Sequence, residues 1–565
     1  MWLPAGFSVY APDVFAVMSG AKVKDFDELT AFLGDYGLFQ ILVIVLLSIS
    51  AIPCGYMAVL AVFVADTPKH HCKVSINSAG NGTDVENSSW IGPDSCSRYK
   101  VNGTWTETAG LGNDTEQCVD GWAYSTEIYT STIVSEWDLV CDNAWKVPFS
   151  TSLYFFGVLT GSLISGHLSD RFGRKIVFFL TMVLQAATAL VQATSVSWVM
   201  FCILNFLRGI GQISNYMGSL VLGSEMLSQS ARVKYTVLGH CLGYGIGYAL
   251  LPLLAYFIRG WRMLLVASAI PSILFFPMWW VIPESPRWLL QKGRVEEAEL
   301  VIRNAAKMNK VTAPEVLFRT DECLELTQNK GDEEHTYTYV DLIRTPNMRN
   351  IQILGVFIWM SVAMVFFGLS LNTSNLNGNV YLNCFISAAT DIVAYLGTWV
   401  LISRVPRPTV LFSTLMFCGL IFLIIQLVPK DMPVLFQVLA LVGRIGVSCA
   451  YCFIFVFFTE LIPTVVRNMG LGVNATAAYI GTIMCPYLIY MGTYSQVLPY
   501  IIFGTVSIMA AAASMLLPDT RNGKLPDLIS QAKPLRGSCC PKDNRATTQS
   551  DATEGWKDTN NSAPC

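Results

Sequence analysis

The sequence predicts an all-α membrane protein: twelve transmembrane helices in two parallel six-helix halves, with one large extracellular loop. Composition, apolar run length and an internal repeat lead to this fold class. Of the 565 residues, 53% are hydrophobic and 14% are charged, whereas a soluble domain carries about 25% charged residues. Long apolar runs alternate with polar turns, and charged motifs recur about 235 residues apart. The net charge of −3 gives no basis for a nucleic-acid partner.

The chain is expected to begin with a cytoplasmic segment, residues 1–39. Residues 1–22 are apolar, but they lack the positively charged start, the short apolar core and the cleavage site of a signal peptide. The first predicted span, 40–65, is long enough to cross a hydrocarbon core about 30 Å thick.

A long polar loop, residues 66–147, follows the first span. Its four Asn-X-Ser/Thr glycosylation acceptors are Asn81, Asn87, Asn102 and Asn113, and its four cysteines are Cys72, Cys96, Cys118 and Cys141. Glycosylation and disulfides are both features of extracellular segments, so we expect this loop outside the cell and the N-terminus inside. Two disulfides are expected, and the sequence leaves all three possible pairings open.

Eleven further spans follow the loop. They are 148–167, 176–195, 199–223, 234–257, 263–282, 351–372, 380–402, 409–428, 434–457, 470–492 and 497–517. Twelve crossings return the C-terminus to the cytoplasmic side. Most basic residues of the short turns then lie inside, as the positive-inside rule requires, and Arg259 and Arg262 are exceptions.

The predicted halves comprise residues 40–282 and 351–517. A charged cytoplasmic linker, 283–350, joins them, and the helical spacing from Arg294 to Arg303 predicts short interfacial helices within it. The polar tail, 518–565, is expected to be cytoplasmic and disordered.

The most specific motif is a polar turn between the second and third spans. It reads Gly166-His-Leu-Ser-Asp170-Arg171-Phe-Gly173-Arg174-Lys175. Glycines permit a tight turn and close helix approach, and basic residues belong on the cytoplasmic side. The turn resembles the loop 2–3 signature of the major facilitator superfamily. That resemblance, together with the repeat, implies a substrate site between the two halves near the membrane midplane.

The internal repeat places matching charges at the cytoplasmic ends of the helices. Glu225 precedes Arg232 by seven residues, Glu460 precedes Arg467 by seven, and the two pairs are 235 residues apart. We expect each glutamate to pair with its arginine when the cytoplasmic gate is shut and to separate from it when the gate opens. The alternative is that these charges anchor the helix ends without moving.

Three residues of the polar turn, Asp170, Arg171 and Arg174, are further gating candidates. The two arginines recur 233 residues later, but Asp170 corresponds to Ser403 and the turn glycine to Pro406. The second gate is therefore expected to be looser than the first or latched differently.

Three charged residues stand out deep inside the predicted spans: Arg208, Asp391 and Arg444. A charge at the bilayer centre costs roughly 3 kcal/mol on insertion scales, so its first interpretation is functional. Arg208 and Arg444 occupy equivalent places in the repeat, which favours a shared architectural role, and Arg444 is also a candidate for the substrate site. Asp391 has no repeat counterpart and is the stronger ligand candidate. A buried pair with an opposite charge is its structural alternative.

Aromatic and amide side chains complete the predicted substrate site. They are Tyr216, Trp359, Phe366 and Tyr479, with Gln212 and Asn215 as hydrogen-bond donors. A carboxylate among aromatic faces suits an organic cation, above all a quaternary ammonium. Packing against the core is the alternative for each ring, and bonding between helices is the alternative for the two amides.

Several blocks resemble the organic cation/carnitine transporter branch of the superfamily. They include Val134-Ser-Glu-Trp-Asp-Leu-Val-Cys141, Gly211-Gln-Ile-Ser-Asn-Tyr216, Ile282-Pro-Glu-Ser-Pro-Arg-Trp-Leu289 and Glu460-Leu-Ile-Pro-Thr-Val-Val-Arg-Asn468. The resemblance implies transport of carnitine-like zwitterions and organic cations across the plasma membrane, with sodium as the coupling ion for carnitine. In this branch Tyr479 stands where carnitine-type members have arginine and cation-only members have aspartate, and Asp391 replaces a glutamate.

Two other classes of function are alternatives to a cation or zwitterion transporter. An organic anion carrier would need basic site residues, and Asp391 without an added binding arginine argues against it. A membrane enzyme or receptor is disfavoured because the sequence has no metal-ligand cluster, no nucleophile–base pair and no Walker loop. No resident cofactor or metal is expected. The expected partners are a small organic ion and the lipid bilayer, and the oligomeric state is left open.

Overall fold

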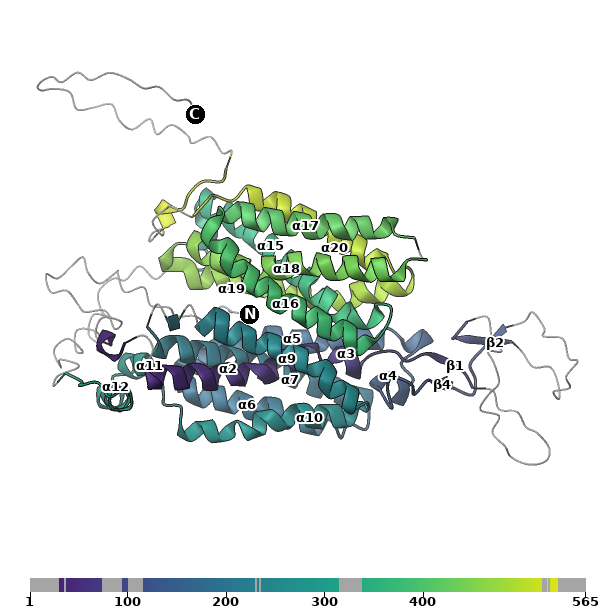
Figure 1. Ribbon diagram of the computed structural model, residues 1–565, viewed down its shortest axis with the longest axis horizontal. Coiled ribbons are helices and arrows are strands. Elements are labelled where there is room, and N and C mark those ends of the chain that lie inside the picture. Colours follow the sequence, from purple (N-terminus) through teal and green to yellow (C-terminus); the bar gives the residue numbers. More distant parts are fainter. Residues whose placement is uncertain are drawn as a thin grey trace, which may run out of the picture.

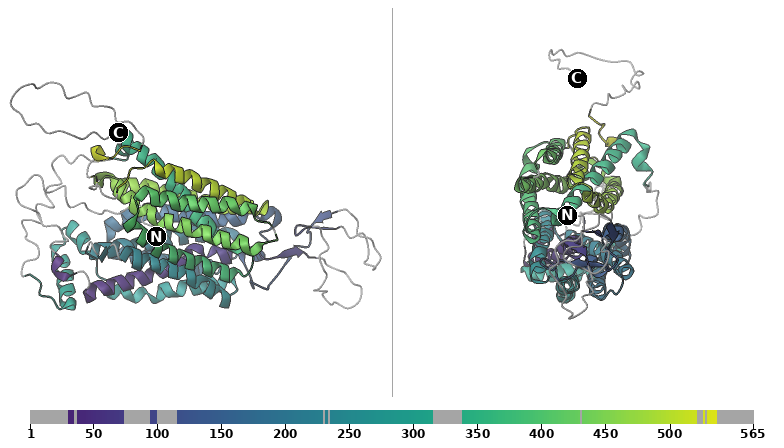
Figure 2. Two further views of the ribbon diagram at one scale, coloured as in Figure 1. Left: turned by 45° about the horizontal axis from the view of Figure 1, so that its top comes forward. Right: turned by 90° about the vertical axis from the view of Figure 1, so that its right-hand side faces the viewer.

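The computed structural model describes residues 30–34, 37–73, 94–99, 115–228, 231–232, 235–314, 338–429, 431–520, 526 and 529–536. Two groups of long helices lie side by side, one purple to teal and one green to yellow (Figure 1 and Figure 2). Small strands project from one end of the molecule, which we call the loop end. The helices α11 (Pro286–Gln291) and α12 (Val295–Asn309) lie at the opposite end, which we call the linker end.

Each predicted span coincides with a helix. The N-terminal half contains α2 (Leu38–Val59) with α3 (Ala61–Val64), α5 (Lys146–Phe172), α6 (Arg174–Gln192), α7 (Trp198–Met226), the π-helical η4 (Tyr235–Cys241) with α9 (Leu242–Phe257), and α10 (Trp261–Leu274) with the 3-10 segment η5 (Phe276–Trp280). The C-terminal half contains α15 (Pro346–Leu371), α16 (Val380–Arg404), α17 (Arg407–Ile424), α18 (Pro433–Leu461), α19 (Arg467–Tyr490) and α20 (Leu498–Met515).

Several helices begin earlier than the apolar runs predict. The first residues of α6, α17 and α19 are Arg174, Arg407 and Arg467. A hydropathy criterion excludes such basic residues, although their backbone already belongs to the helix.

Ten helical segments of the described residues are long and apolar enough to cross a membrane. The helices α7 and α19 are not among them, although they have 29 and 24 residues. Both carry polar side chains, including Arg208 and Asn215 in α7 and Asn474 in α19, and all three of these side chains are buried. A helix shielded from lipid by its neighbours tolerates such residues, so the two helices with the weakest hydropathy are interior helices of the bundle.

The halves meet along two helix pairs, α5 with α19 and α9 with α16. Within the N-terminal half, α5 and α7 approach closely because of glycine. A Cβ at Gly157 would lie 2.1 Å from the carbonyl oxygen of Phe206, so a larger residue there would push the two helices apart.

The linker contains the short helices that the sequence predicts. Ser285 caps α11 by accepting a hydrogen bond from the Trp288 amide. α12 contains the segment of helical spacing up to Arg303, and Arg294 is its N-cap residue. A third short helix, α14 (Asp341–Arg344), precedes α15. The side chain of Asn309 accepts a hydrogen bond of 2.9 Å from the Phe39 amide, which ties the end of α12 to the start of α2.

The loop between the first two spans is built from two antiparallel strand pairs. β1 (His70–Cys72) pairs with β4 (Trp122–Tyr124), and β2 (Ser97–Tyr99) pairs with β3 (Thr115–Gln117). Disulfides join Cys72 to Cys118 and Cys96 to Cys141, which selects one of the three pairings that the sequence leaves open. The acceptors Asn81, Asn87, Asn102 and Asn113 lie outside the described residues, as do most of the predicted N-terminal segment and tail.

Candidate functional site

A buried ion pair between α16 and α18 forms the centre of the candidate substrate site. Nε of Arg444 donates to Oδ1 of Asp391 at 3.0 Å, and Nη2 donates to Oδ2 at 2.7 Å. The hydroxyl of Ser448 donates to Oδ1 at 2.6 Å, and Nη2 of Arg444 also lies 2.9 Å from the hydroxyl of Ser370. Two-point arginine–carboxylate contact of this kind fixes both geometry and charge.

Aromatic rings surround the guanidinium of Arg444. Its Cζ lies 5.4 Å from the ring centre of Phe366 and 5.5 Å from that of Tyr248. Phe366 also stacks on Tyr451, with ring centres 4.4 Å apart. Tyr248 belongs to the N-terminal half and Phe366 to the C-terminal half, so the cation lies where the two halves meet.

This geometry corrects the sequence interpretation of Asp391 and Arg444. Asp391 is not an open carboxylate, because Arg444 already occupies it. The pair is the structural alternative that the sequence allows for Asp391, and Arg444 lies between Asp391 and the ring of Phe366. The repeat comparison missed the pair because Asp391 and its partner lie 53 residues apart on different helices.

Arg208 in α7 is the repeat equivalent of Arg444, but its surroundings differ. Its Nη2 donates to Asn205 at 2.7 Å, and its Cζ lies 5.0 Å from the ring centre of Tyr154. Within the described residues it forms no ion pair with a carboxylate, and its buried Nε has no hydrogen-bond partner. The Nη1 of Arg444 is likewise buried without one. The arginines therefore keep unused donors inside the protein.

Among the described residues of the spans, three buried side chains leave a net charge. Arg208, Asp391 and Arg444 are all buried in the bundle, and together they carry a formal charge of +1. An unbalanced buried charge is costly, and a bound carboxylate group would compensate it.

The other substrate-site candidates in α7 are two amides and one tyrosine, and their contacts differ. Gln212 donates to the Cys54 carbonyl at 3.1 Å, and Asn215 donates to the Phe178 carbonyl at 3.1 Å, so both amides join helices of the same half. Tyr216 is buried against His240, with ring centres 4.1 Å apart, and its hydroxyl has no hydrogen-bond partner among the described residues. The two amides thus form hydrogen bonds between helices, which is the alternative to substrate binding that the sequence allows for them.

The two other predicted aromatics belong to the C-terminal half. Trp359 packs edge-on against Phe455 and Phe458, with ring centres 6.0 Å apart in each case. Its indole nitrogen is buried without a partner in the described part of the chain. Tyr479 in α19 is almost fully buried. In the described part of the chain, the ring contacts of Trp359 are thus with aromatic residues of α18 rather than with the Asp391–Arg444 pair.

At the linker end of the N-terminal half, a cluster of charges surrounds the start of α6. Nε of Arg174 lies 3.2 Å from Glu225, and its Nη1 donates to Asp170 and Ser169. The carboxylate of Glu284 accepts a hydrogen bond of 2.9 Å from the Lys175 amide, as anions do at helix N-termini.

The turn in this cluster depends on glycine. Gly173 has φ +113°, and an added Cβ would lie 2.5 Å from Glu284. The conformation and the close approach of the carboxylate both exclude a side chain there.

The C-terminal half repeats this cluster at the start of α17. Arg407 contacts Glu460 through two hydrogen bonds of 2.9 and 3.0 Å. Asp519 accepts from the Arg407 amide at 3.3 Å, in the place that Glu284 takes in the first half. The charged motifs that recur in the sequence therefore make equivalent contacts in the two halves.

These clusters correct the predicted pairing of the glutamates. Glu225 pairs with Arg174 rather than Arg232, and Glu460 pairs with Arg407 rather than Arg467. Arg232 instead donates to the Ser224 and Leu227 carbonyls, and Arg467 donates to the Ile462 carbonyl. Of the other gating candidates, Arg171 lies beside the ring of Phe172. Both ion pairs lie within one half, so they brace each half rather than join the two.

The ion pair of the second cluster is more exposed than that of the first. The side chains of Arg407 and Glu460 are 13% and 23% exposed, whereas those of Arg174 and Glu225 are 2% and 10% exposed.

One group of metal-ligating side chains occurs among the described residues. His70, Cys96 and Cys141 place their ligand atoms within 4.8 Å of one another. The two cysteines are joined in a disulfide, so the group offers only the histidine to a metal.

Comparison with known proteins identifies the fold and the family. Solved structures of the xylose transporter XylE from E. coli share the fold; one in an inward open conformation has a TM-score of 0.58 at 16% identity, over 86% of this chain and 98% of that one. The family model "Sugar (and other) transporter" matches residues 113–526. Organic cation/carnitine transporter 2 of Rattus norvegicus is 44% identical over 91% of this chain and 95% of its own length. The chain belongs to the organic cation/carnitine transporter branch of the major facilitator superfamily.

Other relatives agree with this membership. The human organic cation/carnitine transporter 2 is also 44% identical, over 91% of this chain and 95% of its own length. The Drosophila melanogaster organic cation transporter protein is 34% identical, over 90% and 94%. A member of this branch is a multi-pass membrane transporter and not an enzyme, which removes the enzyme alternative.

Proposed function

We propose that this protein is a plasma-membrane transporter that moves organic cations and carnitine-like zwitterions by alternating access. The observation that carries the proposal is the Asp391–Arg444 pair. A carboxylate with aromatic rings around it already holds an organic cation there, the guanidinium of Arg444. A substrate ammonium that reaches this site can exchange with that guanidinium, because it gains the same carboxylate and the same ring faces.

The exchange also creates a place for a carboxylate. A displaced Arg444 needs a new counter-charge, and Arg208 forms no ion pair in the described residues. Arg444 has an unused donor at Nη1, and Arg208 has one at Nε. A zwitterion with ammonium and carboxylate groups supplies one charge to each side, so it leaves the buried charges better balanced than a simple cation does.

The names of the relatives support the same substrate class. The rat and human relatives are called organic cation/carnitine transporters. Sodium coupling is part of the proposal on the family resemblance. We place the loop end outside the cell and both termini inside, because the stapled, sequon-rich loop belongs to an extracellular compartment.

An organic anion carrier is the second candidate, and the formal charge of +1 on the three buried side chains favours it. Uptake by Arg208→Gln in proteoliposomes distinguishes the candidates. If the carboxylate of a zwitterion uses Arg208, the KM for carnitine should rise about fivefold or more, while that for tetraethylammonium stays within about twofold. Arg262→Gln, a change of a partly exposed arginine at the loop end, is the matched control. Equal loss for both substrates would contradict this assignment.

A further inference from the structure

A cavity lies at the loop end, and neither Asp391 nor Arg444 lines it. It has a volume of about 560 Å³, which is within the range of small-molecule sites. Its walls come from both halves: Ala65, Asp66 and the start of α5 on one side, and Ser374, Asn375 and Tyr490 on the other. The Cys96–Cys141 disulfide also lines it, so the disulfide-linked loop between the first two spans covers this space.

Asp66 is the acidic residue in the wall of this cavity. The hydroxyl of Tyr129 donates to its Oδ2 at 2.7 Å. Within the described ranges, no arginine, lysine or histidine forms an ion pair with Asp66. Burial raises the pKa of Asp66 to about 6, and hydrogen bonds from Tyr129, the Thr67 amide and Ser374 oppose that shift. At neutral pH the carboxylate is thus mostly ionised, partly desolvated and without a counter-cation.

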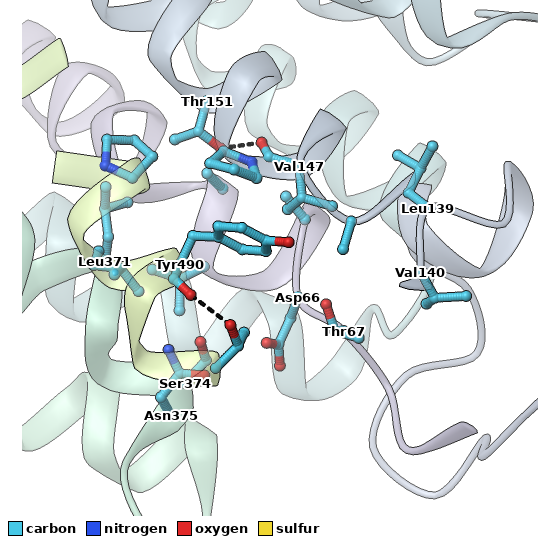
Figure 3. Close-up of a pocket in the computed structure, with 18 of the residues that line it drawn as sticks. Asp66, Thr67, Leu139, Val140, Val147, Thr151, Leu371, Ser374, Asn375 and Tyr490 are labelled. Atoms are coloured by element: carbon cyan, nitrogen blue, oxygen red, sulfur yellow. Dashed lines mark hydrogen bonds between the residues drawn. The ribbon is translucent and has the colours of Figure 1, made fainter. Parts of the chain in front are cut away.

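An aromatic ring stands in the same space. Figure 3 shows the ring of Tyr490 reaching across the cavity, with Val147 and Thr151 of α5 on one side and Asp66 on the other. Thr67 and Asn375 add polar groups beside Asp66. A carboxylate beside an aromatic face in a partly dry space favours an organic ammonium over a strongly hydrated metal ion.

We propose that Asp66 and Tyr490 form an outer binding site for organic ammonium ions, separate from the Asp391 site. A quaternary ammonium there supplies the missing counter-charge of Asp66 and lies against the Tyr490 ring. The walls come from both halves, so the site exists only while the halves are close at the loop end. Tyr381 of α16 keeps them close in this structure: its hydroxyl donates to the Ile128 carbonyl at 2.8 Å, and its ring stacks on Phe63.

The proposal deepens the proposed function, because it names a cation site in addition to the central one. The alternative is that Asp66 only ties the halves together through Tyr129 and Ser374. If Asp66 had only this structural role, it would affect how the loop end assembles. It would not make the cavity distinguish cationic from anionic probes.

The test measures the electrostatic field in the cavity without requiring transport. Thr493, an exposed residue of the cavity rim, is replaced by cysteine in the full-length protein. It is then modified from the loop side by two methanethiosulfonates, one with a trimethylammonium group and one with a sulfonate. The parent protein without Thr493→Cys gives the background. We expect Asp66→Asn to lower the ratio of cationic to anionic modification rates roughly fivefold or more.

Matched variants separate charge from structure. Asp66→Glu should keep the ratio, and Glu127→Gln, which removes an exposed carboxylate at the same end outside the cavity lining, should leave it within about twofold. Tetraethylammonium should slow the modification in the Asp66 background and not in Asp66→Asn. An unchanged ratio in Asp66→Asn, or equal protection by tetraethylammonium in both backgrounds, would overturn the proposal. Failure of the proposed function would appear differently, as absence of organic cation uptake by the wild type with the modification ratios intact.

Discussion

Asp391 and Arg444 bind each other through two hydrogen bonds, and both side chains are almost completely buried. Removing one partner leaves the other charge unpaired in the bundle. We therefore expect Asp391→Asn to destabilise the purified protein by about 3–5 kcal/mol, measured by thermal unfolding in detergent. Asp391→Asn combined with Arg444→Met removes both charges and should recover most of that loss. A stable single variant would contradict the pairing.

The same variants separate stability from substrate binding. If Asp391 also receives the substrate ammonium, the double variant should be stable and still fail to take up tetraethylammonium. Normal uptake by the double variant would mean that the pair is structural alone.

The two clusters at the linker end should differ in strength. Because Arg174 is more buried than Arg407 and also contacts Asp170, Arg174→Gln should lower the unfolding temperature more than Arg407→Gln. Charge reversal tests the partner directly: Arg407→Glu should reduce uptake, and Glu460→Arg in the same chain should restore part of it. The comparison variant combines Arg467→Glu with Glu460→Arg. Better rescue in that comparison would favour the pairing predicted from the sequence.

The disulfide pairing makes a separate prediction. Cys72→Ser and Cys118→Ser should each destabilise the loop, and the double variant should be no worse than either single one. Closure of a loop with a sequence separation of 46 residues is worth about 4 kcal/mol on chain-entropy grounds. Peptide mapping without reduction should recover Cys72 linked to Cys118. Linkage of Cys72 to Cys96 or Cys141 would refute this connectivity.

The outer cavity should respond to pH through Asp66. Burial raises the pKa of Asp66 to about 6, so its negative charge is present above that pH and is lost as the pH falls through it. Between pH 7.5 and 5.5 the ionised fraction falls about fourfold, and protection of Thr493→Cys by tetraethylammonium should weaken to a similar extent. Tyr129 and Ser374 contact Asp66, and His70 lines the same cavity, so the measurement uses a His70→Gln background. Protection that strengthens at pH 5.5 would contradict the assignment.

Much of the fold follows from local sequence signals, and the contacts of the site do not. Apolar run length locates the helices, because crossing a bilayer requires a minimum length. The repeat finds equivalent charges, because both halves use the same motif. Neither signal reports which helices touch. Glu460 lies 7 residues from Arg467 in sequence, yet it pairs with Arg407, 53 residues away, because α17 and α18 pack together.

Asp66 illustrates a second limit. A lone aspartate after an apolar run has no motif around it, so the sequence predicts no role for it. Its significance depends on Tyr129, Ser374 and Tyr490, which come from the loop and from the other half of the protein. Only the folded arrangement brings these groups into one cavity.

Uptake of a charge series by the wild-type protein in proteoliposomes tests the proposed substrate class. The series comprises tetraethylammonium, carnitine and a monocarboxylate of similar size, each with sodium and with potassium outside. We expect saturable uptake of the cation and the zwitterion, faster carnitine uptake in sodium, and little uptake of the carboxylate. Preferential uptake of the carboxylate would contradict this substrate class and would favour the organic anion carrier.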